Sequence, residues 1–248
     1  MRTRLAILAA ALVIPVTQYA QTAINKTIPA QSGQTIIMHF DYPELIHVST
    51  WDKNEIQITG TVSINTGEND DAFELLTSSS GGTITIRNEI KNMKSLPQRI
   101  TIIDGTTKMV FKNKEELRKY ESEHGKRSHD VQSWGVDMDI LIDIKVPRNM
   151  QTRIESVYGM VEIKDFTGPL KVDATYGGVD AALNEKNTGE IIAETSYGEI
   201  YSNLDVKFGG EDSRNEDFHT YVSAKPGSGP SYSFDSKYGN VYLRKATQ

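Results

Sequence analysis

Apolar and polar residues alternate along most of this chain, a pattern typical of β-strands that bury one face. The longest alternating run extends from Val136 to Val146 and ends at Pro147. Shorter runs of the same kind, separated by turn residues, occupy residues 21–92. The pattern therefore predicts an all-β protein.

Residues 93–135 interrupt this alternation and have the composition of a surface insertion. Asn113, followed three residues later by Glu116, is a helix-capping signal, and Gly125 stands where such a helix would end. We therefore expect an insertion with one short, exposed helix. The residues expected to hold this insertion to the main body are apolar: Ile100, Ile102, Met109, Val110 and Phe111.

The C-terminal part of the chain contains one short motif four times: a small residue, any residue, Tyr, Gly, any residue, then Val or Ile. Its Tyr-Gly pairs are Tyr158-Gly159, Tyr176-Gly177, Tyr197-Gly198 and Tyr238-Gly239. Motifs that recur about every 20 residues are typical of repeat proteins, in which each unit buries its apolar face against the next. Residues 136–248 are therefore expected to form stacked rungs.

The positions two and four residues before each repeat Tyr are small or apolar, so they are expected to face inward. Each Tyr shares this parity, which predicts that the rings lie inward or at the corner and stack at the spacing of neighbouring strands, about 4.8 Å. The following Gly removes the side chain where the chain turns between two faces. This unit favours a single-chain parallel β-helix (β-solenoid) over residues 21–248; an antiparallel β-sandwich, with each Tyr-Gly in a hairpin, is the alternative.

Residues 1–20 differ from the rest of the chain. Arg2 and Arg4 precede an uncharged run from Leu5 to Val16, and Ala20 is a small residue at the end of this segment. This is the arrangement of a secretory signal peptide. We expect cleavage after Ala20 and an exported protein in the periplasm, at the cell surface or outside the cell. No second apolar stretch has the length of a membrane span, so we expect none in the mature chain.

Charge and composition narrow the functions that this chain can have. The formal net charge of −6 becomes more negative when the signal peptide is removed, which disfavours nucleic acid as a partner. The absence of cysteine excludes disulfides and thiolate chemistry. No nucleophile or phosphate-binding motif is present. We therefore expect a non-catalytic protein without a cofactor.

Two sets of outward-facing residues are candidates for binding. Four acids stand three residues before the repeat Tyr residues: Glu155, Asp173, Glu194 and Asp235. At a rung spacing of about 5 Å, neighbouring acids repel each other by about 1 kcal/mol per pair in water. A bound calcium ion would relieve this repulsion, and so would nearby lysine and arginine side chains. Tyr201 and Tyr242 occupy the same position in their rungs, where they could bind sugars or simply pack.

Three segments carry a resemblance to a known family: Val48–Ile56, Ile144–Pro147 and Lys237–Arg244. They resemble the adhesin-like proteins of the bacterial envelope, exported β-helix domains without assigned catalytic residues. The resemblance implies an adhesin-like binding or structural module whose partner is an envelope or extracellular protein or glycan. A carbohydrate-active β-helix enzyme, a polysaccharide lyase or hydrolase that uses the acidic column, is the alternative.

Overall fold

A computed structural model describes residues 21–125, 129, 131–209, 214–216 and 218–246. Within these ranges the fold is all-β, with two large mixed sheets, one small sheet and one α-helix. The predicted signal peptide, residues 1–20, lies outside the described residues. No helix in the described ranges is long and apolar enough to cross a membrane.

The first large sheet has eight strands, which are parallel from β10 to β16 and antiparallel at the β1 end. In spatial order these strands are β1 (Thr22–Pro29), β4 (Glu55–Ile64), β10 (Met138–Pro147), β3 (Leu45–Trp51), β12 (Met160–Ile163), β14 (Val179–Leu183), β20 (Val241–Lys245) and β16 (Ile200–Ser202). The strand predicted at Val136–Val146 is confirmed as β10, shifted by two residues at its start.

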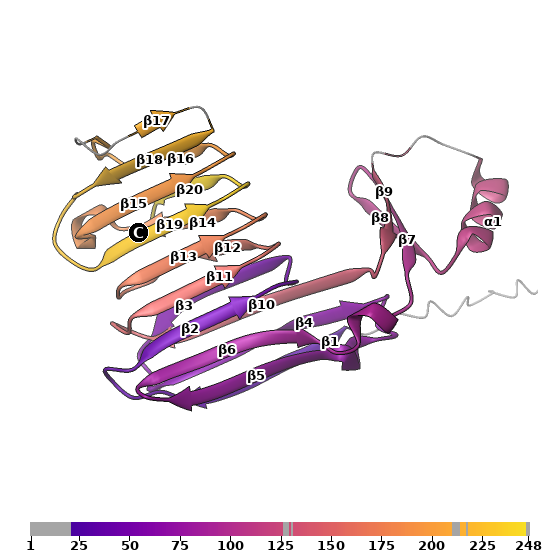
Figure 1. The fold of residues 1–248 in the computed structure, drawn as a ribbon, viewed down its shortest axis with the longest axis horizontal. Helices are drawn as coiled ribbons and strands as arrows, with labels where there is room; N and C mark the ends of the chain where they lie inside the picture. Colours follow the sequence, from indigo (N-terminus) through magenta and orange to yellow (C-terminus); the bar gives the residue numbers. More distant parts are fainter. Residues whose placement is uncertain (1–20, 126–128, 130, 210–213, 217, 247–248) are drawn as a thin grey trace, which may run out of the picture.

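The second large sheet has nine strands, which are parallel from β15 to β6 and antiparallel at both ends. In spatial order these strands are β17 (Arg214–Glu216), β18 (His219–Ala224), β15 (Glu190–Thr195), β19 (Ser231–Ser236), β13 (Leu170–Ala174), β11 (Thr152–Ser156), β2 (Thr35–Phe40), β6 (Thr83–Ile90) and β5 (Phe73–Ser80). Figure 1 shows the stack that these strands build.

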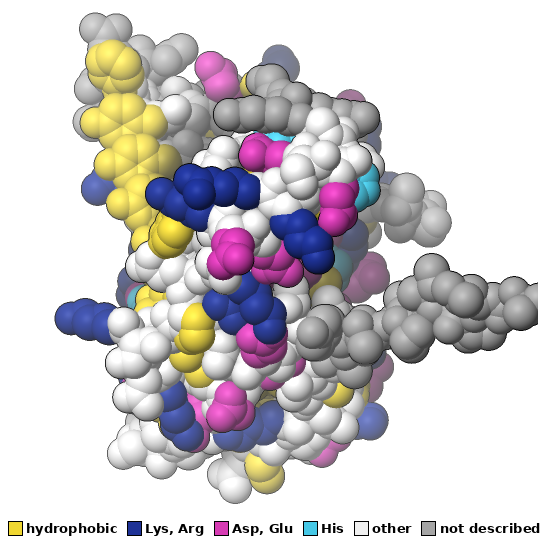
Figure 2. All heavy atoms as spheres, turned by 90° about the vertical axis from the view of Figure 1, so that its right-hand side faces the viewer, with side chains coloured by type: hydrophobic (Ala, Val, Ile, Leu, Met, Phe, Trp, Pro, Cys, Tyr) yellow, Lys and Arg dark blue, Asp and Glu magenta, His cyan; other side chains and the backbone are white. Residues whose placement is uncertain are grey.

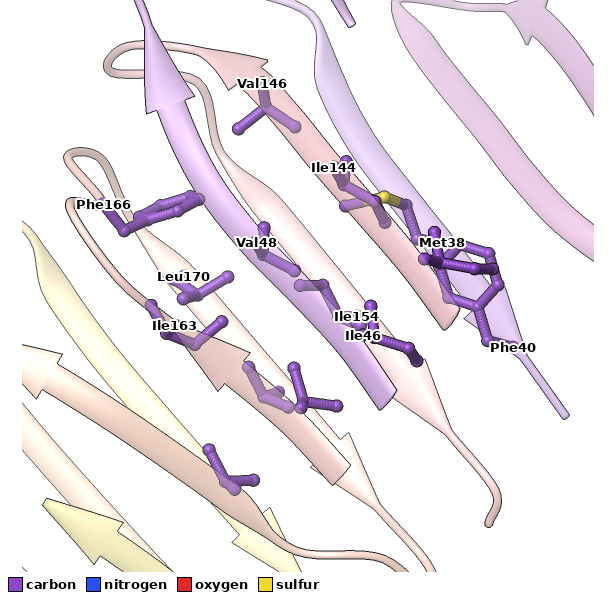
Figure 3. Close-up of a cluster of buried hydrophobic side chains, with 14 of the residues drawn as sticks. Met38, Phe40, Ile46, Val48, Ile144, Val146, Ile154, Ile163, Phe166 and Leu170 are labelled. Atoms are coloured by element: carbon purple, nitrogen blue, oxygen red, sulfur yellow. The ribbon is translucent and has the colours of Figure 1, made fainter. Parts of the chain in front are cut away.

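The core lies between the two large sheets. Alternate residues of each strand are buried, as the burial patterns of β2, β3, β11 and β13 show. In Figure 3, Met38 and Ile154 from the nine-stranded sheet approach Ile46 and Ile144 from the eight-stranded sheet. The inward parity predicted for the residues two and four positions before each repeat Tyr is confirmed, since all of them are buried.

Each Tyr-Gly repeat contributes one strand to each large sheet. The strand before Tyr-Gly belongs to the nine-stranded sheet, and the strand after it belongs to the eight-stranded sheet. Neighbouring repeats pair in parallel and in register, so that Ile154 lies opposite Val172 and Val172 opposite Phe234. The order of the rungs does not follow the sequence, because β19 and β20 of the fourth repeat lie between the second and third repeats.

This arrangement combines features of both folds that the repeats suggested. Parallel pairing of spatially neighbouring repeats is a property of a β-helix, whereas two facing sheets with antiparallel strands at their ends are compatible with a β-sandwich. The fold is all-β, with mixed sheets. Its regular part places every Tyr-Gly corner along one edge of the stack.

The insertion folds around a small core of its own and projects from the stack (Figure 1). It consists of β7 (Arg99–Asp104), β8 (Thr107–Phe111), β9 (Val131–Gly135) and α1 (Lys114–His124). The prediction of one short helix is confirmed, with the Asn113 side chain accepting from the N–H groups of Glu115 and Glu116. The prediction that its apolar residues bind it to the main body is wrong for Ile100, Ile102, Met109 and Phe111. Ile100, Ile102 and Phe111 pack against Leu117 of α1 instead.

The short 3₁₀ helices connect strands at the edges of this architecture. They are η1 (Asp70–Ala72), η2 (Met93–Ser95) and η3 (Glu185–Asn187).

Candidate functional site

The four repeat tyrosines form a stack of exposed rings along one edge of the protein. Ring centroids of neighbouring rungs are 5.1–5.3 Å apart, with interplanar angles of 7–12°. The spatial order is Tyr158, Tyr176, Tyr238 and Tyr197, as the rung order requires. Figure 2 shows hydrophobic side chains gathered in a column on this side of the molecule. The predicted rung-on-rung stacking is therefore confirmed.

The rings were predicted to lie either inward or at the corner. They lie at the corner, so the inward alternative is wrong. Between 45% and 59% of each of the four tyrosines is exposed. The alternation of a β-strand applies only while the backbone stays extended. Tyr158 follows the end of β11 at Ser156 and lies in the bend that leads to β12, where its parity no longer decides the direction of its side chain.

Two further aromatic rings lie at the ends of this stack, Tyr42 stacked on Tyr158 and Phe218 tilted by 39° against Tyr197. We call the six rings the tyrosine ladder: Tyr42, Tyr158, Tyr176, Tyr238, Tyr197 and Phe218. Tyr42 lies 6.2 Å from Tyr158, and Phe218, which is 75% exposed, lies 5.8 Å from Tyr197. Tyr42 follows β2 as the repeat tyrosines follow their strands, with Pro43 in place of glycine. The position of Tyr42 could therefore have been predicted from its partial match to the repeat motif, whereas no motif in the sequence points to Phe218.

The repeat glycines are required by the close approach of successive corners. A Cβ atom at Gly177 would lie 2.0 Å from the Gly159 carbonyl oxygen, and one at Gly239 would lie 2.0 Å from that of Gly177. A Cβ atom at Gly198 would lie equally close to the Gly239 carbonyl oxygen. Because these contacts are with backbone atoms, no side-chain rearrangement relieves them. The glycines therefore permit the rung spacing at which the tyrosine rings stack.

The small residue of the motif supports the corner through its hydroxyl group in three rungs, and Ser156 Oγ donates to the Gly159 carbonyl of its own corner at 3.0 Å. Ser236 Oγ donates to the Gly177 carbonyl at 2.9 Å and accepts from the Gly239 N–H at 3.0 Å. Thr195 Oγ1 donates to the Gly239 carbonyl and accepts from the Gly198 N–H, both at 3.0 Å. These bonds link adjacent corners and satisfy backbone groups that leave the sheet there. The corner that carries the rings is thus held rigidly.

The predicted column of acids is present on the outer face of the nine-stranded sheet, beside the tyrosine ladder. Glu155, Asp173, Asp235 and Glu194 are neighbours in register, in that spatial order. Arginine and lysine side chains pair with two of them. Arg153 contacts Glu155 at 2.9 Å and Asp173 at 3.0 Å, and Lys171 contacts Asp173 at 3.1 Å.

Histidines pair with the two outer acids of the column. His39 lies 3.0 Å from Glu155 and 2.8 Å from Asp41, and His219 lies 2.7 Å from Glu194. Burial lowers the pKa of His39, but hydrogen bonds and charge interactions with Glu155 and Asp41 outweigh this and raise it. The ends of the column are thus compensated by cationic or potentially cationic groups.

Asp235, in the middle of the column, has no ion pair with a basic group of the described residues. Burial raises the pKa of its carboxyl group, and the negative charges of Glu194 and Asp173 raise it further. Lys171 and His219 act in the opposite direction without outweighing these effects. The charged form of Asp235 therefore destabilises the folded state at neutral pH.

We expect Asp235→Asn to stabilise the protein at pH 7 by about 1 kcal/mol, the size of one such repulsion in water. Because the pKa of Asp235 is raised in the folded state, the penalty disappears as the pH falls through that pKa. The difference between variant and wild type should therefore vanish in acid. Urea unfolding of the variant and the wild type at neutral and at acid pH measures the difference in their free energies of unfolding under both conditions. Asp173→Asn, which loses two ion pairs, is the matched control and should bring no gain.

No group of three or more His, Cys, Asp or Glu side chains in the described ranges is arranged to hold a metal ion. Calcium binding by the acidic column stays a prediction from the sequence, and an increase in melting temperature on addition of calcium would support it.

The second predicted site, Tyr201 and Tyr242, lies on the outer face of the eight-stranded sheet. The two rings stack with centroids 5.2 Å apart, and the Arg244 guanidinium lies 5.2 Å from the Tyr242 ring. The Tyr242 hydroxyl accepts a hydrogen bond from Asn240 Nδ2 at 3.1 Å. The shared outward position is thus as expected, while sugar binding by this pair stays a prediction.

No protein-family model and no curated protein match this chain. Among solved structures, a "putative cell adhesion protein" from Clostridium sporogenes aligns over 91% of this chain and 100% of its own length, with a TM-score of 0.51 and 11% identity. A "putative adhesin" from Bacteroides fragilis aligns over 92% of this chain and 99% of its own length, with a TM-score of 0.20 and 12% identity, too dissimilar to support an inference. The first comparison shows that this chain is similar in fold to that protein.

Proposed function

We propose that this chain is an exported, non-catalytic, adhesin-like binding module of the bacterial envelope, and that the tyrosine ladder is its contact surface. The observation that carries the proposal is a row of six aromatic rings along one edge, in which the four repeat tyrosines are stacked and exposed and Phe218 is exposed at one end. Contiguous exposed apolar surface of this kind marks interaction sites in soluble proteins.

The geometry of the tyrosine ladder suits binding rather than packing alone. Each inner ring covers the face of its neighbours, so the ring edges and hydroxyl groups are presented to a partner. Within the described residues, none of the four repeat tyrosines uses its hydroxyl group in a hydrogen bond. Stacking also restricts the rings before binding, which lowers the entropy lost in the complex.

The charges beside the tyrosine ladder indicate the chemistry of the partner. The acidic column runs parallel to the ladder, three residues before each repeat tyrosine. Basic groups of the chain already pair with the other three acids, so a partner that contacts the rings would gain most from a basic group placed near Asp235. An envelope or extracellular protein, or a glycan with cationic substituents, has this combination.

Two other observations support the proposal. The segment at residues 1–20 has the composition of a secretory signal, which is consistent with export. The solved structure with a similar fold is described as a "putative cell adhesion protein". At 11% identity this likeness concerns the fold, so the binding role rests on the tyrosine ladder itself.

Protease treatment of intact cells tests whether the protein is placed to act as an adhesin. We expect the mature chain to be degraded on intact cells, with a cytoplasmic protein as the control that remains protected. Immunodetection in lysed cells shows that the chain is cleavable. Protection until lysis would contradict surface exposure and leave a role inside the envelope.

A further inference from the structure

A cavity of about 520 Å³ opens at the edge of the stack opposite the tyrosine ladder, where β12 and β14 end. Its lining comes mainly from the loop after β12, the loop after β14 and the segment that enters β19, with Thr50, Arg148 and Ala246 completing it. This volume is within the range of small-molecule sites, about 300–1,000 Å³.

The cavity arises from the order of the rungs. The loop after β12 leads to β13, the neighbouring rung, but the loop after β14 must reach β15 beyond the inserted strands β19 and β20. The two loops therefore diverge, and Pro230 enters between them at the start of the inserted rung. A stack whose rungs followed the sequence would have equivalent loops side by side here.

The walls of the cavity are held in place by hydrogen bonds. The Tyr232 hydroxyl donates to the Phe166 carbonyl at 3.0 Å, which joins the inserted rung to the loop after β12. Thr50 Oγ1 donates to the Asp165 carbonyl at 2.8 Å, and Thr188 Oγ1 donates to the Asn184 carbonyl at 2.8 Å. Phe166, Tyr232 and Leu183 are buried beneath these loops, so the floor is apolar and fixed.

In contrast to the apolar floor, the rim of the cavity carries polar side chains. Asn184, Asn187 and Asp165 line the cavity, and their side-chain polar atoms have no hydrogen-bond partner in the part of the chain that the structure describes. Arg148 also lines it and contacts Asp52 through Nε at 2.6 Å. Amide groups supply both donors and acceptors. Because Arg148 is paired with Asp52, Asp165 is the one charged lining residue without an ion pair in the described part of the chain.

We propose that this cavity binds one or two units of an uncharged sugar. Sugar hydroxyl groups both donate and accept hydrogen bonds, which the two amides, the carboxylate and the guanidinium can satisfy, while the apolar floor accommodates C–H groups. The carboxylate of Asp165, which has no ion pair in the described part of the chain, disfavours an acidic sugar. The site lies at the edge opposite the tyrosine ladder, so it is independent of the binding role proposed for that surface.

Saturation-transfer NMR of the full mature chain tests this site directly. The probes are glucose, galactose, mannose, N-acetylglucosamine, maltose, cellobiose and lactose, each at millimolar concentration. We expect transfer to at least one of them. Asn184→Ala and Asn187→Ala should each weaken its binding about three- to tenfold, the effect of one lost hydrogen bond. Asp165→Asn keeps the size of the side chain and removes its charge, and it should weaken binding comparably.

Two controls separate this site from others. Asn25→Ala removes an exposed asparagine of β1, which is not part of the cavity lining, and should leave binding unchanged. Tyr176→Ser with Tyr238→Ser alters the tyrosine ladder and should also leave it unchanged, so this proposal and the ladder proposal can fail separately. The inference is overturned if no sugar of the set receives transfer, or if the three cavity variants, folded by circular dichroism, bind the sugar as the wild type does.

Discussion

Gly239→Ala is expected to destabilise the protein by about 3 kcal/mol or more, the upper range for forcing atoms into a packed site. The added Cβ atom would lie 2.0 Å from the Gly177 carbonyl oxygen and 2.5 Å from its carbonyl carbon. Both atoms belong to the backbone of the neighbouring rung, so the corner must move as a whole. That movement would also strain the hydrogen bonds between Ser236 and the same two glycines.

Thermal unfolding followed by circular dichroism measures this effect, with an expected decrease in Tm of about 6–12 °C for a domain of this size. Gly135→Ala is the matched control, because a Cβ atom there meets nothing within 4 Å and the residue has no positive φ. The control should remain within about 0.5 kcal/mol of the wild type. A Gly239→Ala protein as stable as this control would contradict the close stacking of the corners.

Much of the rung structure could be predicted because it depends on local pattern. The buried faces of β11, β13, β15 and β19 follow from alternation, since a strand exposes successive side chains on opposite faces. The stacking of the repeat tyrosines and the alignment of the acidic column follow from the repetition of one motif at equivalent positions.

The direction of the tyrosine rings could not be predicted in the same way. Extrapolating strand parity from Ser156 to Tyr158 assumes an extended backbone, but the chain bends between these residues. The sequence also explained only in part why the motif requires glycine. Their place at a corner was expected, whereas the contact of Gly239 with Gly177 depends on which rung lies next to it.

The order of the rungs depends on interactions that no single repeat contains. Every repeat presents the same apolar strand and the same corner, so nothing local determines that β19 pairs with both β13 and β15. The cavity proposed to bind sugar results from this order, so it could not be predicted from the sequence either. The insertion could not be predicted fully for the same reason. Its pattern of apolar residues is consistent both with packing against the main body and with the small separate core that they form.

Replacement of two central rings of the tyrosine ladder, Tyr176→Ser with Tyr238→Ser, is expected to weaken partner binding about a hundredfold or more. Tyrosines at the centre of an interface commonly contribute 2 kcal/mol or more each when truncated, and 1.4 kcal/mol corresponds to a factor of ten. The cost to stability should be small, because 45% or more of each side chain is already exposed. The loss would therefore report on contact with the partner.

Tyr201→Ser is the matched control, since this tyrosine is 50% exposed but lies on the outer face of the eight-stranded sheet. It removes one stacked ring without altering the tyrosine ladder. If Tyr201→Ser weakened binding while the ladder variant did not, the contact surface would be the Tyr201–Tyr242 pair instead.

The most direct test is biolayer interferometry of the mature chain over immobilised extracellular-matrix proteins, mucin and bacterial envelope fractions. We expect the wild type and Tyr201→Ser to bind at least one of these surfaces saturably, and the Tyr176→Ser/Tyr238→Ser protein to lose that binding. Binding to the same surface should weaken as the salt concentration rises, because the acidic column lies beside the rings. Equal binding by the wild type and the ladder variant, or no binding by the wild type, would contradict the proposal.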